Sequence, residues 1–121
     1  MCMKIDQALE MYNKACQAEL EGKIILAEVY YLKSWSLFEQ VGGVHTLNAA
    51  NALNGLALLR RSRGDVEGAR RSIKQSICLM EIYGSQFPGA DADLIKATAW
   101  DLMHSLNSYD VPAQEFLRIA G

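Results

Sequence analysis

A correspondence between residues 42 positions apart constrains the fold of this chain more than any other feature of its sequence. Small residues keep their places at this spacing, with Ala15, Ala57 and Ala99 in one series and Gly22 and Gly64 in another. Few other residues are identical at this spacing, but side-chain size and polarity are largely kept. Such a pattern indicates a structural unit that is repeated along the chain.

Each unit has the pattern of two α-helices joined by a tight turn, because apolar residues recur every three or four positions and glycine follows. Half of the 121 residues are apolar, which is enough to form a core. We therefore expect one all-α domain of about six helices, arranged as three antiparallel helical hairpins stacked side by side. The predicted units span about 4–43, 44–87 and 88–121.

Glycine and proline set the predicted helix bounds. The first four helices are expected at about 4–20, 23–40, 46–62 and from Asp65, an N-cap residue, to the loop between Gly84 and Pro88. A fifth is expected from Ala90 to Leu106, and Asp110 and Pro112 would begin a short sixth.

Two features predict how these helices pack. Alanines near the connecting turns, such as Ala27 and Ala69, would let antiparallel helices approach closely. The second predicted helix is apolar on most of its sides, so we expect it to be covered on both faces, with Trp35 in the core.

Charge and motif content argue against several functional classes. The net charge is −2, which disfavours a protein built to bind nucleic acid. The two histidines and three cysteines lack metal-site spacing, so no metal or cofactor is expected. No catalytic motif is present, which predicts a protein that is not an enzyme. No apolar run reaches the roughly 18 residues of a membrane span, and a reducing cytoplasmic setting is the simplest expectation.

Five arginines crowd around the second predicted turn, although the chain as a whole is acidic. One interpretation is a patch for an acidic partner or a nucleic acid, and the other is a solvated turn whose cations favour the preceding helix end. The arginines are Arg60, Arg61, Arg63, Arg70 and Arg71.

The run GDVEGARRSIKQSICLME, from Gly64 to Glu81, resembles the second half of a tetratricopeptide repeat, and NALNGLALL, from Asn51 to Leu59, resembles its first helix. The 42-residue spacing is similar to the long variant of this repeat found in kinesin light chains and related bacterial proteins. In that variant a proline-containing loop joins the repeats, and residues 83–92 with Pro88 match it.

This resemblance implies that the hairpins stack as a short right-handed superhelix. It also implies a scaffold that binds peptides or partner proteins in a concave groove, lined by the first helix of each repeat. In that groove Asn51 and Asn54 would hold a peptide backbone, Arg61 and Lys96 a carboxylate, and Trp100 an apolar anchor. The positions that the resemblance places in the groove are Tyr12, Cys16, Glu19, Asn51, Asn54, Leu58, Arg61, Asp93, Lys96, Trp100 and His104.

A homodimeric helical module, with the terminal helices as its interface, is the alternative expectation. The predicted sixth helix carries an apolar stripe that needs a cover: Val111, Phe116, Leu117 and Ile119.

Overall fold

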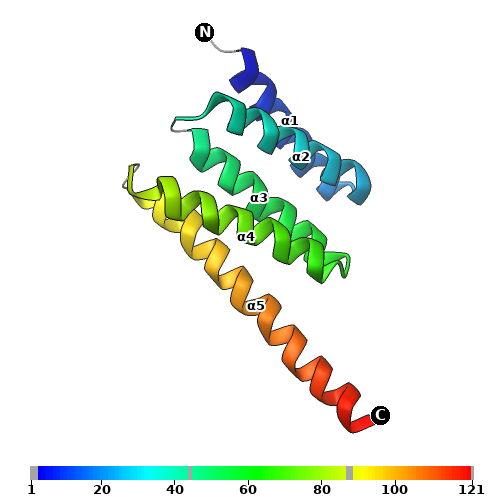
Figure 1. Ribbon diagram of the computed structural model, residues 1–121. Coiled ribbons are helices and arrows are strands. Elements are labelled where there is room, and N and C mark those ends of the chain that lie inside the picture. Colours follow the sequence, from blue (N-terminus) through cyan, green and yellow to red (C-terminus); the bar gives the residue numbers. More distant parts are fainter. Residues whose placement is uncertain (1–2, 44, 87–88, 121) are drawn as a thin grey trace.

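The computed structural model is all-helical throughout the residues that it describes, which confirms the all-α part of the predicted fold class (Figure 1). The backbone is described for residues 3–43, 45–86 and 89–120, and the side chains for residues 3–43, 45–86 and 89–107. Within these ranges five α-helices follow one another, with a short 3₁₀ turn, η1, at Gly84–Gln86. They are α1 (Met3–Leu20), α2 (Ile24–Val41), α3 (His45–Ser62), α4 (Val66–Tyr83) and α5 (Ala90–Ala120).

The first four helices form two antiparallel pairs of equal size. Each has 18 residues, and every bound of α3 and α4 lies 42 residues after the matching bound of α1 and α2. The bounds predicted for these helices are confirmed to within a few residues.

The prediction of a short sixth helix is wrong, because α5 continues without a break from Ala90 to Ala120. The ends of α1, α2 and α3 are each followed by a glycine with a positive φ angle, and no glycine lies between Leu106 and Pro112. Pro112 alone therefore does not end the helix. The second half of α5 extends beyond the other helices (Figure 1).

The turns that close α1 and α3 have the same geometry. Gly22 and Gly64 have φ angles of 76° and 86°, and the residues after them donate backbone hydrogen bonds of 2.8 Å to Ala18 and Arg60. This is the Schellman arrangement, in which glycine adopts a left-handed conformation at little steric cost.

Asp65 caps α4, as predicted from the sequence. Its carboxylate accepts a hydrogen bond of 2.9 Å from the backbone N–H of Gly68. This bond is the main cause that lowers the pKa of Asp65, since it stabilises the ionised form.

Buried serines join the two helices of each pair. Ser34 of α2 donates a hydrogen bond of 2.9 Å to the carbonyl of Ala8, and Ser76 of α4 donates one of 3.1 Å to the carbonyl of Ala50. Each bond gives a buried hydroxyl the hydrogen-bond partner that it needs. Because the two bonds join matching residues, they fix the same relative position of the helices in both pairs.

Alanines lie at the helix contacts, as predicted. Ala57, Ala69 and Ala99 are fully buried in one cluster of α3, α4 and α5, and Ala15 and Ala27 are fully buried in a second cluster. Larger side chains would overpack these contacts, at about 1–3 kcal/mol each.

The expectation that α2 is covered on both faces is wrong. Helix α2 packs mainly on α1 and α3, and it buries Tyr31 and Phe38 against them. Ile25, Leu26 and Val29 remain exposed, because no further described helix packs on that face. Trp35 packs beside the cluster that contains Phe38, in agreement with its predicted place in the core.

Candidate partner-binding surface

Tyr31 joins α1, α2 and α3 in a cluster of polar and aromatic side chains. Its hydroxyl donates a hydrogen bond of 2.8 Å to Oε1 of Glu19, and the sulfur of Cys16 lies 3.8 Å from that hydroxyl. The Tyr12 ring meets the Tyr31 ring edge-on at 5.8 Å, and Nδ2 of Asn51 donates to the Tyr12 hydroxyl at 3.2 Å. The structure thus brings together four of the residues predicted for the groove: Tyr12, Cys16, Glu19 and Asn51.

Gly55 provides the space for the Tyr31 ring. A Cβ atom on Gly55 would lie 2.7 Å from Cε1 of Tyr31, which is too close for two carbon atoms. The position that matches Tyr31 in α4 is Ile73, which is buried and has no polar group. The tyrosine therefore adds a hydroxyl at a place where the second helical pair has only apolar packing.

Both tyrosines of the cluster are held in their neutral form. Burial is the largest cause that raises the pKa of Tyr12 and of Tyr31, and the hydrogen bond to Glu19 raises the pKa of Tyr31 further. Tyr31 therefore remains a hydrogen-bond donor to Glu19 in neutral solution.

The raised pKa of Tyr31 predicts a loss of stability at alkaline pH. A group whose pKa is raised by folding stabilises the folded state below its unfolded pKa of 10.0, and this contribution is lost as the pH rises further. In Tyr31→Phe we expect the free energy of unfolding to be about 1 kcal/mol lower at pH 7, and to fall less steeply above about pH 10. Urea unfolding between about pH 7 and 11 measures both effects, and equal slopes in the two proteins would contradict the assignment.

A second group of predicted residues lies where α3 meets α5. Nδ2 of Asn54 donates a hydrogen bond of 3.1 Å to the carbonyl of Ile95, and Nη1 of Arg61 donates one of 2.9 Å to the hydroxyl of Ser105. Asn54 is only 3% exposed, so its amide ties α3 to α5 and is not presented to solvent. Its Oδ1 has no hydrogen-bond partner among the described residues.

Leu58 and Trp100 are the exposed apolar residues of this region. Leu58 lies on α3 between Asn54 and Arg61, so it shares the side of α3 that turns toward α5. Leu58 is 40% exposed, and Trp100 on α5 is 39% exposed. The Trp100 ring lies 6.5 Å from the ring of His104, one turn further along α5. An exposed tryptophan is a residue type enriched among those that dominate protein–protein affinity.

The structure places Lys96 apart from Arg61, with which it was predicted to bind a carboxylate. Lys96 and Asp93 line a hollow of about 380 Å³ between α4 and α5, together with Met80, Glu81 and Gly84. Lys96 therefore lies toward α4, whereas Arg61 contacts the side of α5 that carries Ser105.

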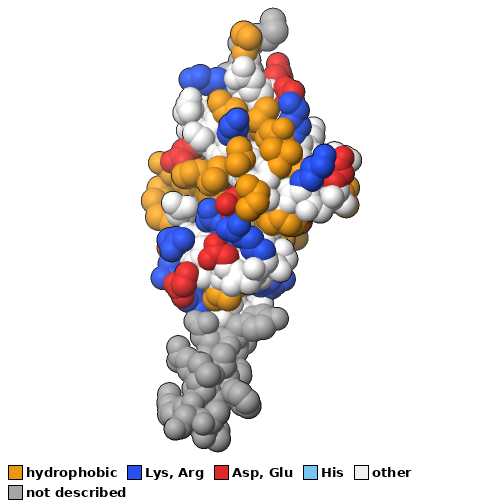
Figure 2. Space-filling view, turned by 90° about the vertical axis from the view of Figure 1, so that its right-hand side faces the viewer, with side chains coloured by type: hydrophobic (Ala, Val, Ile, Leu, Met, Phe, Trp, Pro, Cys, Tyr) orange, Lys and Arg blue, Asp and Glu red, His pale blue; other side chains and the backbone are white. Residues whose placement is uncertain are grey.

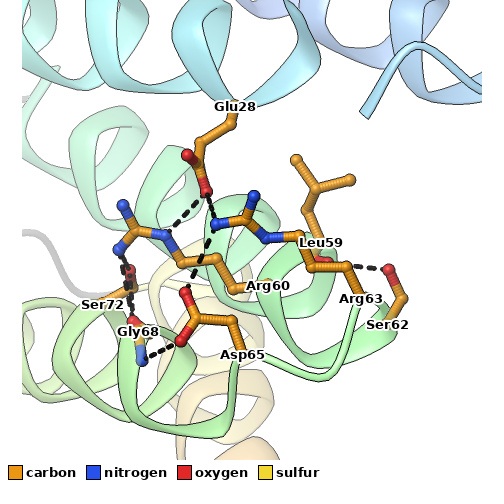
Figure 3. A network of polar contacts seen from close by, with 8 residues as sticks. All are labelled: Glu28, Leu59, Arg60, Ser62, Arg63, Asp65, Gly68 and Ser72. Atoms are coloured by element: carbon orange, nitrogen blue, oxygen red, sulfur yellow. Dashed lines mark hydrogen bonds and ion pairs between the residues drawn. The ribbon is translucent and has the colours of Figure 1, made fainter. Parts of the chain in front are cut away.

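The arginines near the second turn mostly contact other parts of the protein (Figure 3). Nε of Arg60 and Nη2 of Arg63 each donate to Oε1 of Glu28 at 3.0 Å, which ties α3 to α2. Arg60 also donates to the carbonyl of Gly68 and to the hydroxyl of Ser72, which ties α3 to α4. Much of the positive charge of this cluster is therefore already compensated.

Among the five clustered arginines, Arg61 and Arg71 have no ion pair within the described residues, and only Arg61 of these two is half-buried. Arg63 forms a second ion pair, with Asp65, and Arg70 forms one with Glu67. Within the described residues Arg61 forms no ion pair, and Ser105, its hydrogen-bond partner, is neutral. A half-buried guanidinium without a carboxylate is a group that a partner can bind.

Comparison with known proteins identifies no relative. A scan against protein-family models gave no match, and neither the curated proteins nor the solved structures contained one. None of the described helices has the length and apolar character to cross a lipid bilayer. The described residues also contain no group of three or more potential metal ligands.

Proposed function

We propose that this protein binds a segment of another protein on the surface formed by α1, α3 and α5, and that it acts by binding and not by catalysis. The observation that carries this proposal is the place of Arg61. Its guanidinium has only a neutral partner, Ser105, and it lies one turn from the exposed Leu58.

The side chains of this surface have the chemistry of a binding site. Arginine and tryptophan are enriched among the residues that dominate protein–protein affinity, and Arg61 and Trp100 supply both. A partner that offers a carboxylate to Arg61 and an apolar side chain to Leu58 or Trp100 would satisfy both kinds of group. At the α1 end of the surface, Glu19 keeps one carboxylate oxygen that Tyr31 does not use.

We also propose that the helical pairs stack as in tetratricopeptide proteins, in a superhelix whose groove holds this segment. The matching bounds of the two pairs, their matching Schellman turns and their matching serine bonds support this arrangement. The free thiols of Cys16 and Cys78 agree with a reducing, cytoplasmic setting.

The other interpretation of the arginines, as a nucleic-acid surface, has less support. Arg60 and Arg63 share Glu28, and Arg70 contacts Glu67, so these side chains are not arranged to neutralise phosphates.

A selection from a library of random displayed peptides tests the proposed function. We expect enrichment of peptides that contain an acidic residue near an apolar one. For such a peptide, Arg61→Ala and Trp100→Ala should each raise the dissociation constant about tenfold or more, as measured by calorimetry. Arg71→Ala, which removes an exposed arginine of α4, is the matched control and should change it less than about twofold.

Two outcomes would contradict the proposal. One is the absence of any enriched peptide on the wild-type protein. The other is enrichment of peptides whose affinity is the same for the wild type, Arg61→Ala and Trp100→Ala.

A further inference from the structure

Four apolar side chains at the turn between α1 and α2 are exposed to solvent. Leu20, which ends α1, is 84% exposed, and Ile25 on the first turn of α2 is 67% exposed. Leu26 and Val29 continue this face of α2 at 41% and 40%. We call these four residues the turn patch. Figure 2 looks onto this end of the molecule and shows hydrophobic side chains gathered over its upper half, where α1 and α2 lie.

Folding does not require apolar residues at these places. The matching positions of the second helical pair carry Ser62, Glu67, Gly68 and Arg71. The helix bounds, the turn geometry and the buried serine bonds are nevertheless the same in both pairs. The turn patch is therefore an addition to the fold, and exposed apolar groups of this kind mark an interaction surface.

The charges around the turn patch allow it to meet a copy of itself. Glu21 is paired with Lys23 at 3.5 Å, and Glu28 is held by Arg60 and Arg63. Two such surfaces can therefore come together without bringing uncompensated like charges into contact, which an isologous interface needs.

We propose that two copies of this chain associate through the turn patch, with their α2 helices antiparallel across a two-fold axis. In an antiparallel arrangement whose midpoint lies at the level of Ala27, Lys33 lies about 9 Å along α2 from that midpoint. It therefore reaches past Ile24, where α2 of the other copy begins, to the turn that carries Glu21 of that copy. Lys33 is exposed and forms no ion pair within the described residues, so it is available for this contact.

Only Leu20 of the turn patch lies on a helix of the surface proposed for the partner segment, and none of the four patch residues is Leu58, Arg61 or Trp100, on which that surface depends. The two proposals can therefore fail separately. The turn patch has four side chains, fewer than the roughly 20–30 residues that each partner contributes to a standard interface, so we expect a dimer with a dissociation constant in the micromolar range.

Sedimentation equilibrium from about 1 µM to about 1 mM tests the proposal. We expect the wild type to change from one chain to two across this range. The double variant Ile25→Glu/Val29→Arg, which carries the residues that α4 has at the matching positions, should stay monomeric, with a dissociation constant raised about 100-fold or more. The matched control is Leu94→Lys, at a residue of α5 that is also 67% exposed, and it should dimerise as the wild type does.

A charge exchange tests the antiparallel arrangement. Glu21→Lys and Lys33→Glu should each weaken the dimer at low salt, and the combined variant should recover most of the loss. A wild type that is monomeric at about 1 mM would overturn the proposal. So would a dimer that survives Ile25→Glu/Val29→Arg, or one that depends on residues 108–121, since the interface would then be the terminal helix. Absence of recovery in the combined variant would overturn the antiparallel arrangement.

Discussion

Replacing Phe38 with alanine is expected to lower the free energy of unfolding by about 3–5 kcal/mol, because it removes a buried aromatic ring from a contact among three helices. Phe38 is 2% exposed and packs with Ala8 of α1 and Ala49 of α3. Its ring also stacks on His45 at 6.1 Å, at the start of α3. The alanines beside it are too small to fill the cavity. Urea unfolding followed by circular dichroism measures the change.

Leu94→Ala is the control for this prediction. Leu94 is a large apolar residue that remains exposed on α5, so its loss should change the free energy of unfolding by less than about 0.5 kcal/mol. A loss below about 1 kcal/mol for Phe38→Ala would show that the ring is not buried among α1, α2 and α3.

Replacing Glu28 with alanine is expected to cost about 2–3 kcal/mol, because one carboxylate oxygen accepts hydrogen bonds from two arginines. The side chains of Glu28 and Arg60 are 18% and 17% exposed, so removal of the carboxylate leaves the Arg60 guanidinium mostly buried without its counter-ion. Arg60 also holds the start of α4 through Gly68 and Ser72. The change therefore loosens the contact of α3 with α2 and α4, and thermal and urea unfolding measure it.

The matched control is Glu10→Ala. Glu10 pairs with Lys14 on the surface of α1, where the two side chains are 58% and 47% exposed. Such a pair contributes at most about 0.5 kcal/mol, because water and salt screen it. Equal losses for Glu28→Ala and Glu10→Ala would mean that the Glu28 network does not join the helices.

The local signals in the sequence were sufficient to predict the first four helices. Gly22 and Gly64 determine where α1 and α3 end, since each takes a backbone conformation that other residues avoid. Asp65 determines where α4 begins, because its carboxylate caps the first turn. The end of α5 was predicted incorrectly, because Pro112 was given the weight of a helix boundary where no glycine supports one.

Long-range contacts limited what the sequence could say about the surface. Tyr31 and Glu28 were not predicted as members of polar clusters, because their partners lie in other helices and no local pattern specifies them. One signal was available for Tyr31. It stands where the second unit has Ile73, and Gly55, which leaves space for its ring, follows in α3.

Burial and the orientation of α5 about its own axis decide where two of the residues predicted for the groove lie. Asn54 is used inside the protein, and Lys96 lies toward α4. Neither feature follows from position along the chain, since hydrophobic periodicity gives the face of a helix only to within about one residue.

The most direct test of the proposed function is a nuclear magnetic resonance titration of the isotope-labelled protein with a selected peptide. We expect the largest shift changes at the indole N–H of Trp100, the methyl groups of Leu58 and the guanidinium of Arg61, together with backbone amides of α1, α3 and α5. Changes confined to α2 and α4, or no changes when the peptide is saturating, would contradict a binding surface on these three helices.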